Sequence, residues 1–109
     1  MSSDLSQIVA ESADTAELHA PVPTLLLELQ TLLGTLTATV AAETNRGRSP
    51  FRPGPDWAAR LGELAYGVYL LADQTSVDVT SAVTATAHAV SSSARPTPPV
   101  GGDWPFEGR

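Results

Sequence analysis

Glu28, Arg60 and Glu63 are the charged side chains best placed to do chemistry in this sequence. Glu28 lies in a leucine-rich run, where a carboxylate needs a polar partner, and Arg60 is the natural candidate. Arg60 and Glu63 are three residues apart, so both project from one helical face. Two kinds of chemistry are open to them. One is a structural ion pair, and the other is a phosphate or nucleotide contact through the guanidinium.

The other reactive residue types form no recognisable site. His19 and His88 have no second histidine or carboxylate at ligand spacing, so zinc is not predicted. The absence of cysteine excludes disulfides and cysteine-based metal sites. The sequence has neither a Gly-x-Ser-x-Gly nucleophile motif nor a glycine-rich phosphate loop. Three further arginines are interpreted as solvated loop charges, with a phosphate clamp as the alternative: Arg46, Arg48 and Arg52.

Composition predicts one small acidic domain. The chain has 109 residues, a net charge of −6 and a hydrophobic fraction of 42%, which suffices for one core. An acidic body argues against nucleic-acid binding. No secretory signal precedes the first predicted helix, and Glu28 and Gln30 interrupt the apolar run that would have to span a membrane. We therefore expect a soluble cytoplasmic protein with no membrane partner.

Hydrophobic periodicity predicts four helices. Apolar residues recur every three or four positions over roughly 4–15, 24–43, 57–74 and 79–93. Ser3, Asp56 and Asp78 are the expected N-caps of the first, third and fourth helices, because their side-chain oxygens can accept from free backbone N–H groups. Two prolines predict a connection over 16–23, and three more predict a loop over 44–56.

The helix over 24–43 has an unusually wide leucine face. Such a helix either lies at the centre of the domain or packs against a second copy of the chain. We expect at least a dimer, with the helix over 24–43 in its interface. Gly34, in its middle, is expected to mark a close helix approach. The helical domain then covers 1–93, followed by an irregular Pro- and Gly-rich tail over 94–109. Trp104 and Phe106 in this tail could dock on the body, dock on a neighbour or stay exposed.

Three short segments occur in an order and spacing typical of one known family. They are Leu61-Gly62-Glu63-Leu64, Tyr69-Leu70-Leu71-Ala72-Asp73 and Val77-Asp78-Val79. Over about 24–90 the chain thus resembles the MazG-like, all-α nucleoside triphosphate pyrophosphohydrolases. The resemblance implies an all-α bundle of three or four helices that forms homodimers or homotetramers. It also implies a Mg²⁺-dependent reaction that splits a nucleoside triphosphate into monophosphate and pyrophosphate.

The family motif places four carboxylates, as Glu-x-x-Glu on one helix and Glu-x-x-Asp on the next. Aligned with this motif, the first pair falls on Glu28 and Thr31, and the second on Arg60 and Glu63. A further family glutamate, just before the first, is Leu27 here. The resemblance thus leaves Glu28 and Glu63 as the candidate metal ligands. Leu27, Thr31 and Arg60 are the altered positions, and the Arg60 charge would repel a divalent cation.

Three functional hypotheses follow. The first is a MazG-like protein with an eroded metal site, inactive, that binds a nucleotide or a protein and needs no cofactor. The second is a weak Mg²⁺-dependent pyrophosphohydrolase that uses Glu28 and Glu63, helped by Glu43 or Asp56. The third is a small helical adaptor. A nucleotide would contact Arg60 through its phosphate, and its base would stack on Trp57 or on one of two tyrosines, Tyr66 or Tyr69. The alternative for all three aromatic residues is a role in the core or in a subunit interface.

Overall fold

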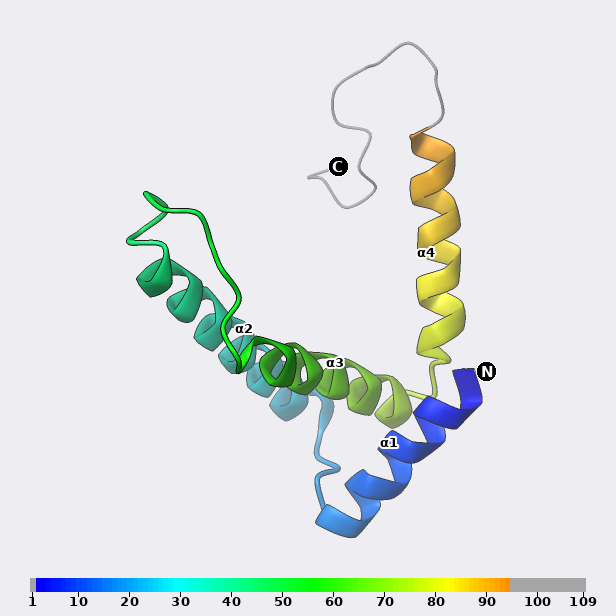
Figure 1. Cartoon of the computed structure of the whole chain (residues 1–109). Coiled ribbons are helices and arrows are strands. Elements are labelled where there is room, and N and C mark those ends of the chain that lie inside the picture. Colours follow the sequence, from blue (N-terminus) through cyan, green and yellow to red (C-terminus); the bar gives the residue numbers. More distant parts are fainter. Residues whose placement is uncertain (1, 95–109) are drawn as a thin grey trace.

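The computed structural model describes residues 2–94, which form four α-helices (Figure 1). Their bounds are α1 Ser2–Ala16, α2 Val22–Glu43, α3 Trp57–Gln74 and α4 Val79–Ser93. The described residues contain no strand, which confirms the all-α class and all four predicted helices. The predicted tail lies outside the described residues from position 95 onward, and with it Trp104 and Phe106.

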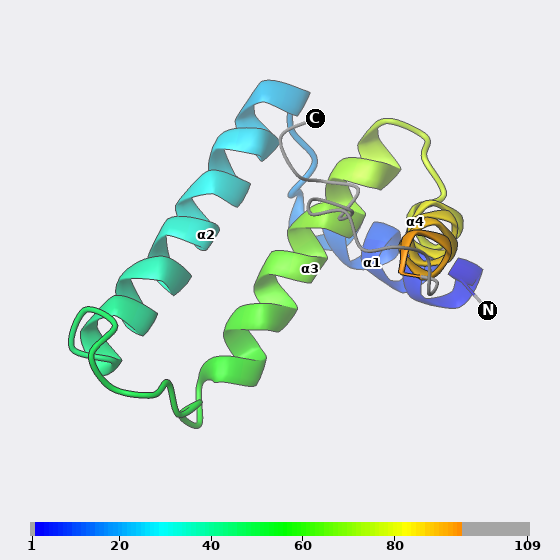
Figure 2. The same cartoon turned by 90° about the horizontal axis from the view of Figure 1, so that it is seen from above.

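Helices α2 and α3 form an antiparallel hairpin (Figure 2). They are in close contact at Gly67, where an added Cβ would lie 2.6 Å from Leu29 Cδ2. The prediction that Gly34 marks a close approach is wrong, because an added Cβ there would meet nothing within 4 Å. Gly67 lies on the side of α3 that faces α2, whereas Gly34 is exposed on the far side of α2.

The predicted helix starts are partly corrected. Residues 16–23 were expected to be non-helical, but α2 begins at Val22 with Pro23 in its first turn, where no backbone N–H is needed. Helix α1 begins at Ser2, so Ser3 lies inside it and does not cap it. Asp56 makes no side-chain cap bond, because its own backbone is already in the right-handed helical region.

Asp78 is confirmed as the N-cap of α4. Its carboxylate accepts from the Ser81 backbone N–H at 3.2 Å and from the Ser81 hydroxyl at 3.0 Å. These hydrogen bonds favour the charged form and therefore hold the pKa of Asp78 below its usual value of 3.8. The bond from the Ser81 backbone has the largest effect. The cap therefore fixes the point at which the chain leaves α3 and turns into α4.

The loop between α2 and α3 begins with three residues of positive φ. Asn45, Arg46 and Gly47 have φ values of 51°, 62° and 89°. The Arg46 N–H donates to the Ala41 carbonyl at 2.7 Å, and the buried Thr44 hydroxyl accepts from the Gly47 N–H at 3.0 Å. The end of α2 is thus closed by a short left-handed turn, which glycine adopts without strain at position 47.

The core lies where α1 crosses α3. Ala13, Leu25 and Leu70 form its buried centre, with Tyr66 and Leu71 against it. The Ser12 and Tyr66 hydroxyls are 2.6 Å apart and link the two helices. Helix α4 packs mainly against α1 and points away from the hairpin (Figure 1). The core therefore occupies one side and one end of the hairpin.

Helix α2 is mostly uncovered. Only Leu25 and Leu36 are buried among its residues, so the first of the two alternatives, a position at the centre of the domain, is wrong. The radius of gyration is 16.9 Å, whereas a compact domain of this length has one of about 13 Å. By length and composition alone α2 is also apolar enough to cross a membrane. In the described part of the chain, α3 packs against one side of its leucine face, while Leu26, Leu27 and Leu33 stay exposed.

Candidate functional site

A pocket of about 570 Å³ opens between α2 and α3, on the side where α1 packs. Glu28 and Glu63, the two candidate metal ligands, both line it. The rest of the lining is apolar or small: Leu18, Leu25, Leu29, Leu32, Ala59, Gly62, Tyr66, Gly67 and Leu70. We call this side of the hairpin the carboxylate face. The structure therefore brings together the two carboxylates that the sequence singled out.

Arg60 pairs with Glu63 and not with Glu28. Its Nη1 lies 3.5 Å from Glu63 Oε1, with the two side chains 47% and 50% exposed. An exposed pair of this kind contributes less than about 1 kcal/mol. The predicted salt bridge from Arg60 to Glu28 is wrong because the two residues lie at different heights along the α2–α3 hairpin. Leu29 lies against Gly67, so Arg60 is about eight residues, or roughly 12 Å, nearer the loop than Glu28 is.

The same register separates the two carboxylates. Glu63 is four residues from Gly67 toward the loop, and Glu28 is one residue from Leu29 in the other direction. Their offset along the hairpin is therefore about five residues, or roughly 7 Å. A single Mg²⁺ holds its ligand oxygens at about 2.1 Å. Both side chains would have to lean toward one another to share one ion.

The altered motif positions lie outside this pocket. The Thr31 hydroxyl donates to the Leu27 carbonyl at 3.1 Å, one turn back on α2. Leu27 and Thr31 line a shallow hollow on the outer side of α2, and Leu27 is 63% exposed. The helix geometry thus directs both side chains away from the side that bears Glu63. Among the four motif positions, only Glu28 and Glu63 line the pocket.

The expected helper carboxylates lie elsewhere. Glu43 and Asp56 line a separate hollow of about 120 Å³ at the loop end, together with Arg60 and Trp57. Residues of the 44–56 loop close this hollow, and neither carboxylate lines the Glu28 pocket. Within the part of the chain that the structure describes, no group of three or more His, Cys, Asp or Glu residues could hold a metal ion.

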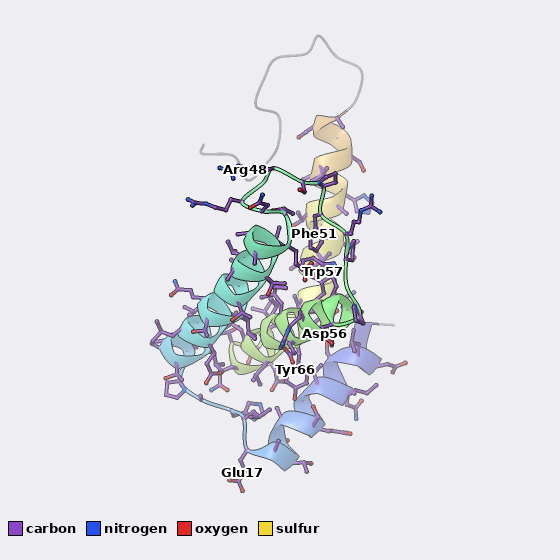
Figure 3. All side chains as sticks on the ribbon, turned by 60° about the vertical axis from the view of Figure 1, so that its left-hand side comes forward. Glu17, Arg48, Phe51, Asp56, Trp57 and Tyr66 are labelled. Atoms are coloured by element: carbon purple, nitrogen blue, oxygen red, sulfur yellow. The ribbon has the colours of Figure 1, made fainter. Side chains whose placement is uncertain are left out.

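Aromatic residues divide between the two regions. Trp57 packs edge-to-face on Phe51, with ring centroids 4.9 Å apart, at the loop end (Figure 3). Tyr66 lines the carboxylate pocket, while the Tyr69 hydroxyl lies 3.5 Å from that of Thr80. The residue placed to stack on a ligand beside Glu28 and Glu63 is therefore Tyr66. Trp57 instead packs against the loop residue Phe51.

His19 makes contacts that the sequence did not reveal. Its Nδ1 lies 3.2 Å from an Asp14 oxygen and its Nε2 2.9 Å from an Asp73 oxygen. Asp73 is 54 residues away in the chain, and local spacing therefore gave no signal. The arrangement ties the α1–α2 connection to the end of α3. His88 is exposed on α4.

No protein-family model, curated protein or solved structure matches this chain. The family resemblance therefore rests on the order and spacing of the residues themselves.

Proposed function

We propose that this protein is a MazG-like helical scaffold whose metal site has eroded and which has no pyrophosphohydrolase activity. The observation that carries the proposal is the Arg60–Glu63 ion pair beside a pocket with only two carboxylates. A fixed positive charge within one helical turn of Glu63 opposes divalent-ion binding and engages the carboxylate that would bind the ion. The pocket then serves to bind a nucleotide, or its surroundings bind a protein partner.

A specific observation favours the second candidate, a weak Mg²⁺-dependent nucleoside triphosphate pyrophosphohydrolase. Glu28 and Glu63 line one pocket although they come from different helices. Two carboxylates can hold Mg²⁺ when substrate phosphates and water complete its octahedral shell. An ion held by Glu28 and Glu63 would supply charge stabilisation for a triphosphate and a more acidic water. The third candidate, a helical adaptor, predicts neither a nucleotide nor a metal in this pocket.

One screen separates these candidates. Unmodified and modified nucleoside triphosphates are presented with Mg²⁺ or Mn²⁺, and both released pyrophosphate and thermal stability are measured. The scaffold proposal expects no pyrophosphate above background, no metal-dependent shift, and a raised Tm with one nucleotide class. Mg²⁺-dependent pyrophosphate release that disappears in Glu63→Ala, and persists in the exposed control Asp4→Ala, would establish the second candidate instead. No response to any nucleotide would favour the adaptor.

The proposal includes self-association and a cytoplasmic location, with no nucleic-acid or membrane partner. The bundle is open and leaves large apolar side chains of α2 and α3 exposed. A homodimer or homotetramer would bury them, because burial of apolar surface drives association. Light scattering on the full chain tests this part separately from the nucleotide screen.

A further inference from the structure

The hairpin has a second face, on the side away from the carboxylates, that we call the bare face. It consists of eight large apolar residues of α2 and α3: Leu26, Leu33, Leu36, Val40, Trp57, Leu61, Leu64 and Val68. Six of these line one broad hollow, and Leu26 and Val68 continue it by helical spacing. The only charged residue lining that hollow is Arg46, at the loop end.

Half of the bare face is exposed in the single chain, whereas Val40, Trp57 and Leu64 are half-buried and Leu36 is buried. Leu33 is 55% exposed, Leu26 46% and Leu61 43%. The residues of this face span 26–40 and 57–68, about 20 Å along the helices and about 20 Å across them, or roughly 400 Å² in projection before side-chain relief is counted. This is about half of the roughly 800 Å² per partner that stable interfaces bury. An uncharged apolar surface of this size marks an interaction site.

Charge is distributed unequally along the hairpin. The loop carries Arg46, Arg48 and Arg52, with Glu43 and Asp56 at its two edges, so residues 43–56 have a net charge of +1. The opposite, open end carries Asp14, Glu17, Asp73 and Asp78, and neither 1–45 nor 61–94 contains an arginine. Figure 3 shows Arg48 and Glu17 at opposite ends of the molecule. The hairpin is therefore positive at one end and negative at the other.

We infer that the bare face is occupied by a second copy of this chain, packed face to face with its ends reversed. About such a two-fold axis, α2 lies over the partner's α2, and each arginine loop lies over the partner's acidic open end. The alternative two-fold pairing would set the arginine loops side by side, which is unfavourable for like charges. The inference rests on the self-association proposed above and not on its nucleotide chemistry.

Light scattering on the full chain tests the occupant. We expect a dimer at micromolar concentration, and a monomer for Leu33→Glu and Leu61→Glu. Both side chains are exposed in the single chain, so both variants should keep their helical circular dichroism. The matched control is Leu27→Glu, which places the same charge on the outer side of α2 and should leave the dimer intact. A monomeric wild-type chain would overturn the inference.

Cross-linking tests the orientation, since the chain has no cysteine of its own. Leu26 and Val40 each lie seven residues, or about 10 Å, from Leu33 near the middle of the bare face. With ends reversed, residue 26 of one copy lies over residue 40 of the other. A bismaleimide spanning about 10 Å, the usual distance between packed helices, should therefore join Leu26→Cys to Val40→Cys in a mixture. Neither variant should cross-link alone.

Two results would contradict the orientation or the occupant. Cross-linking of Leu26→Cys alone and of Val40→Cys alone, with no gain on mixing, would show like ends together. Flotation of the wild-type chain with zwitterionic phosphatidylcholine vesicles, lost in Leu33→Glu, would assign the face to lipid, which the length and composition of α2 make a fair alternative. Either result overturns the inference, and neither bears on the nucleotide screen.

Discussion

The two faces of the α2–α3 hairpin are built from the same two leucine-rich helices, yet they differ in charge and in cover. The carboxylate face presents Glu28 and Glu63 around a pocket, and α1 packs along part of it. The bare face presents apolar side chains, and no described helix covers it. A pocket lined with carboxylates is suited to a small ligand, whereas a broad apolar surface is suited to another protein surface. One hairpin can therefore offer two kinds of site without interference.

The largest effect is expected at the contact between Gly67 and Leu29, because it joins the two helices that form both faces. Gly67→Val places a branched side chain against Leu29, which already lies 2.6 Å from the position of an added Cβ. Forcing the helices apart should cost about 2 kcal/mol, in the range of overpacked cores. Urea unfolding measures this cost. Gly34→Val is the matched control and should be near neutral, because the space around Gly34 is open.

The second effect should fall on the bare face alone. Reversing the loop charges, in the triple variant R46E/R48E/R52E, removes the attraction to the acidic end of the second copy. We expect the dimer to weaken about tenfold at low salt, or about 1.4 kcal/mol. Sedimentation at several salt concentrations measures it. A dimer that is equally strong after reversal, with the same salt dependence, would show that the ends of the two copies do not meet.

The third effect should be confined to the outer helices. The pKa of Asp78 is lowered in the folded chain below its usual value of 3.8. The charged cap therefore stabilises α4 fully at pH values above 3.8, and this stabilisation is lost as the pH falls through the lower pKa of the folded chain. Asp78→Asn keeps a capping oxygen and should remove this acid-dependent part of the unfolding curve. At neutral pH the variant should dimerise like the wild type. Weaker dimers at neutral pH would mean that α4 contributes to the bare-face interface.

The smallest effect concerns the carboxylate face. Arg60→Ala breaks a half-exposed ion pair and should change stability by less than about 1 kcal/mol. It should also remove the charge that opposes cations near Glu63. A Mn²⁺-dependent rise in Tm in this variant, absent from the wild type, would support the electrostatic account of the eroded site. An equal rise in both proteins would mean that Arg60 does not control metal binding.

Sequence periodicity located the four helices, because apolar spacing within one helix is a local property. It could not supply the register between helices. Leu29 meets Gly67, and that register separates Arg60 from Glu28, whereas the pairing of Arg60 with Glu63 is local to α3. The same limit explains why the close approach between helices was expected at Gly34 and found at Gly67. It also explains why the contact of His19 with Asp73 was not predicted.

Part of the candidate site was predicted and part was not. Glu28 and Glu63 were identified from the family motif, and they line one pocket. Glu43 and Asp56 were expected nearby, but the loop folds them into a different hollow beside Trp57. A proline- and glycine-rich loop has no periodic pattern, so its path could not be inferred from spacing.

The left-handed turn after α2 has a consequence for how two copies can meet. Domain swapping would require α2 and α3 to separate and the loop to open into an extended linker. The Arg46 N–H is held by the Ala41 carbonyl, and Gly47 by the Thr44 hydroxyl, so opening would break both bonds and expose a buried threonine. Exchange of helices between chains is thereby disfavoured, and each copy enters an assembly as an already closed hairpin.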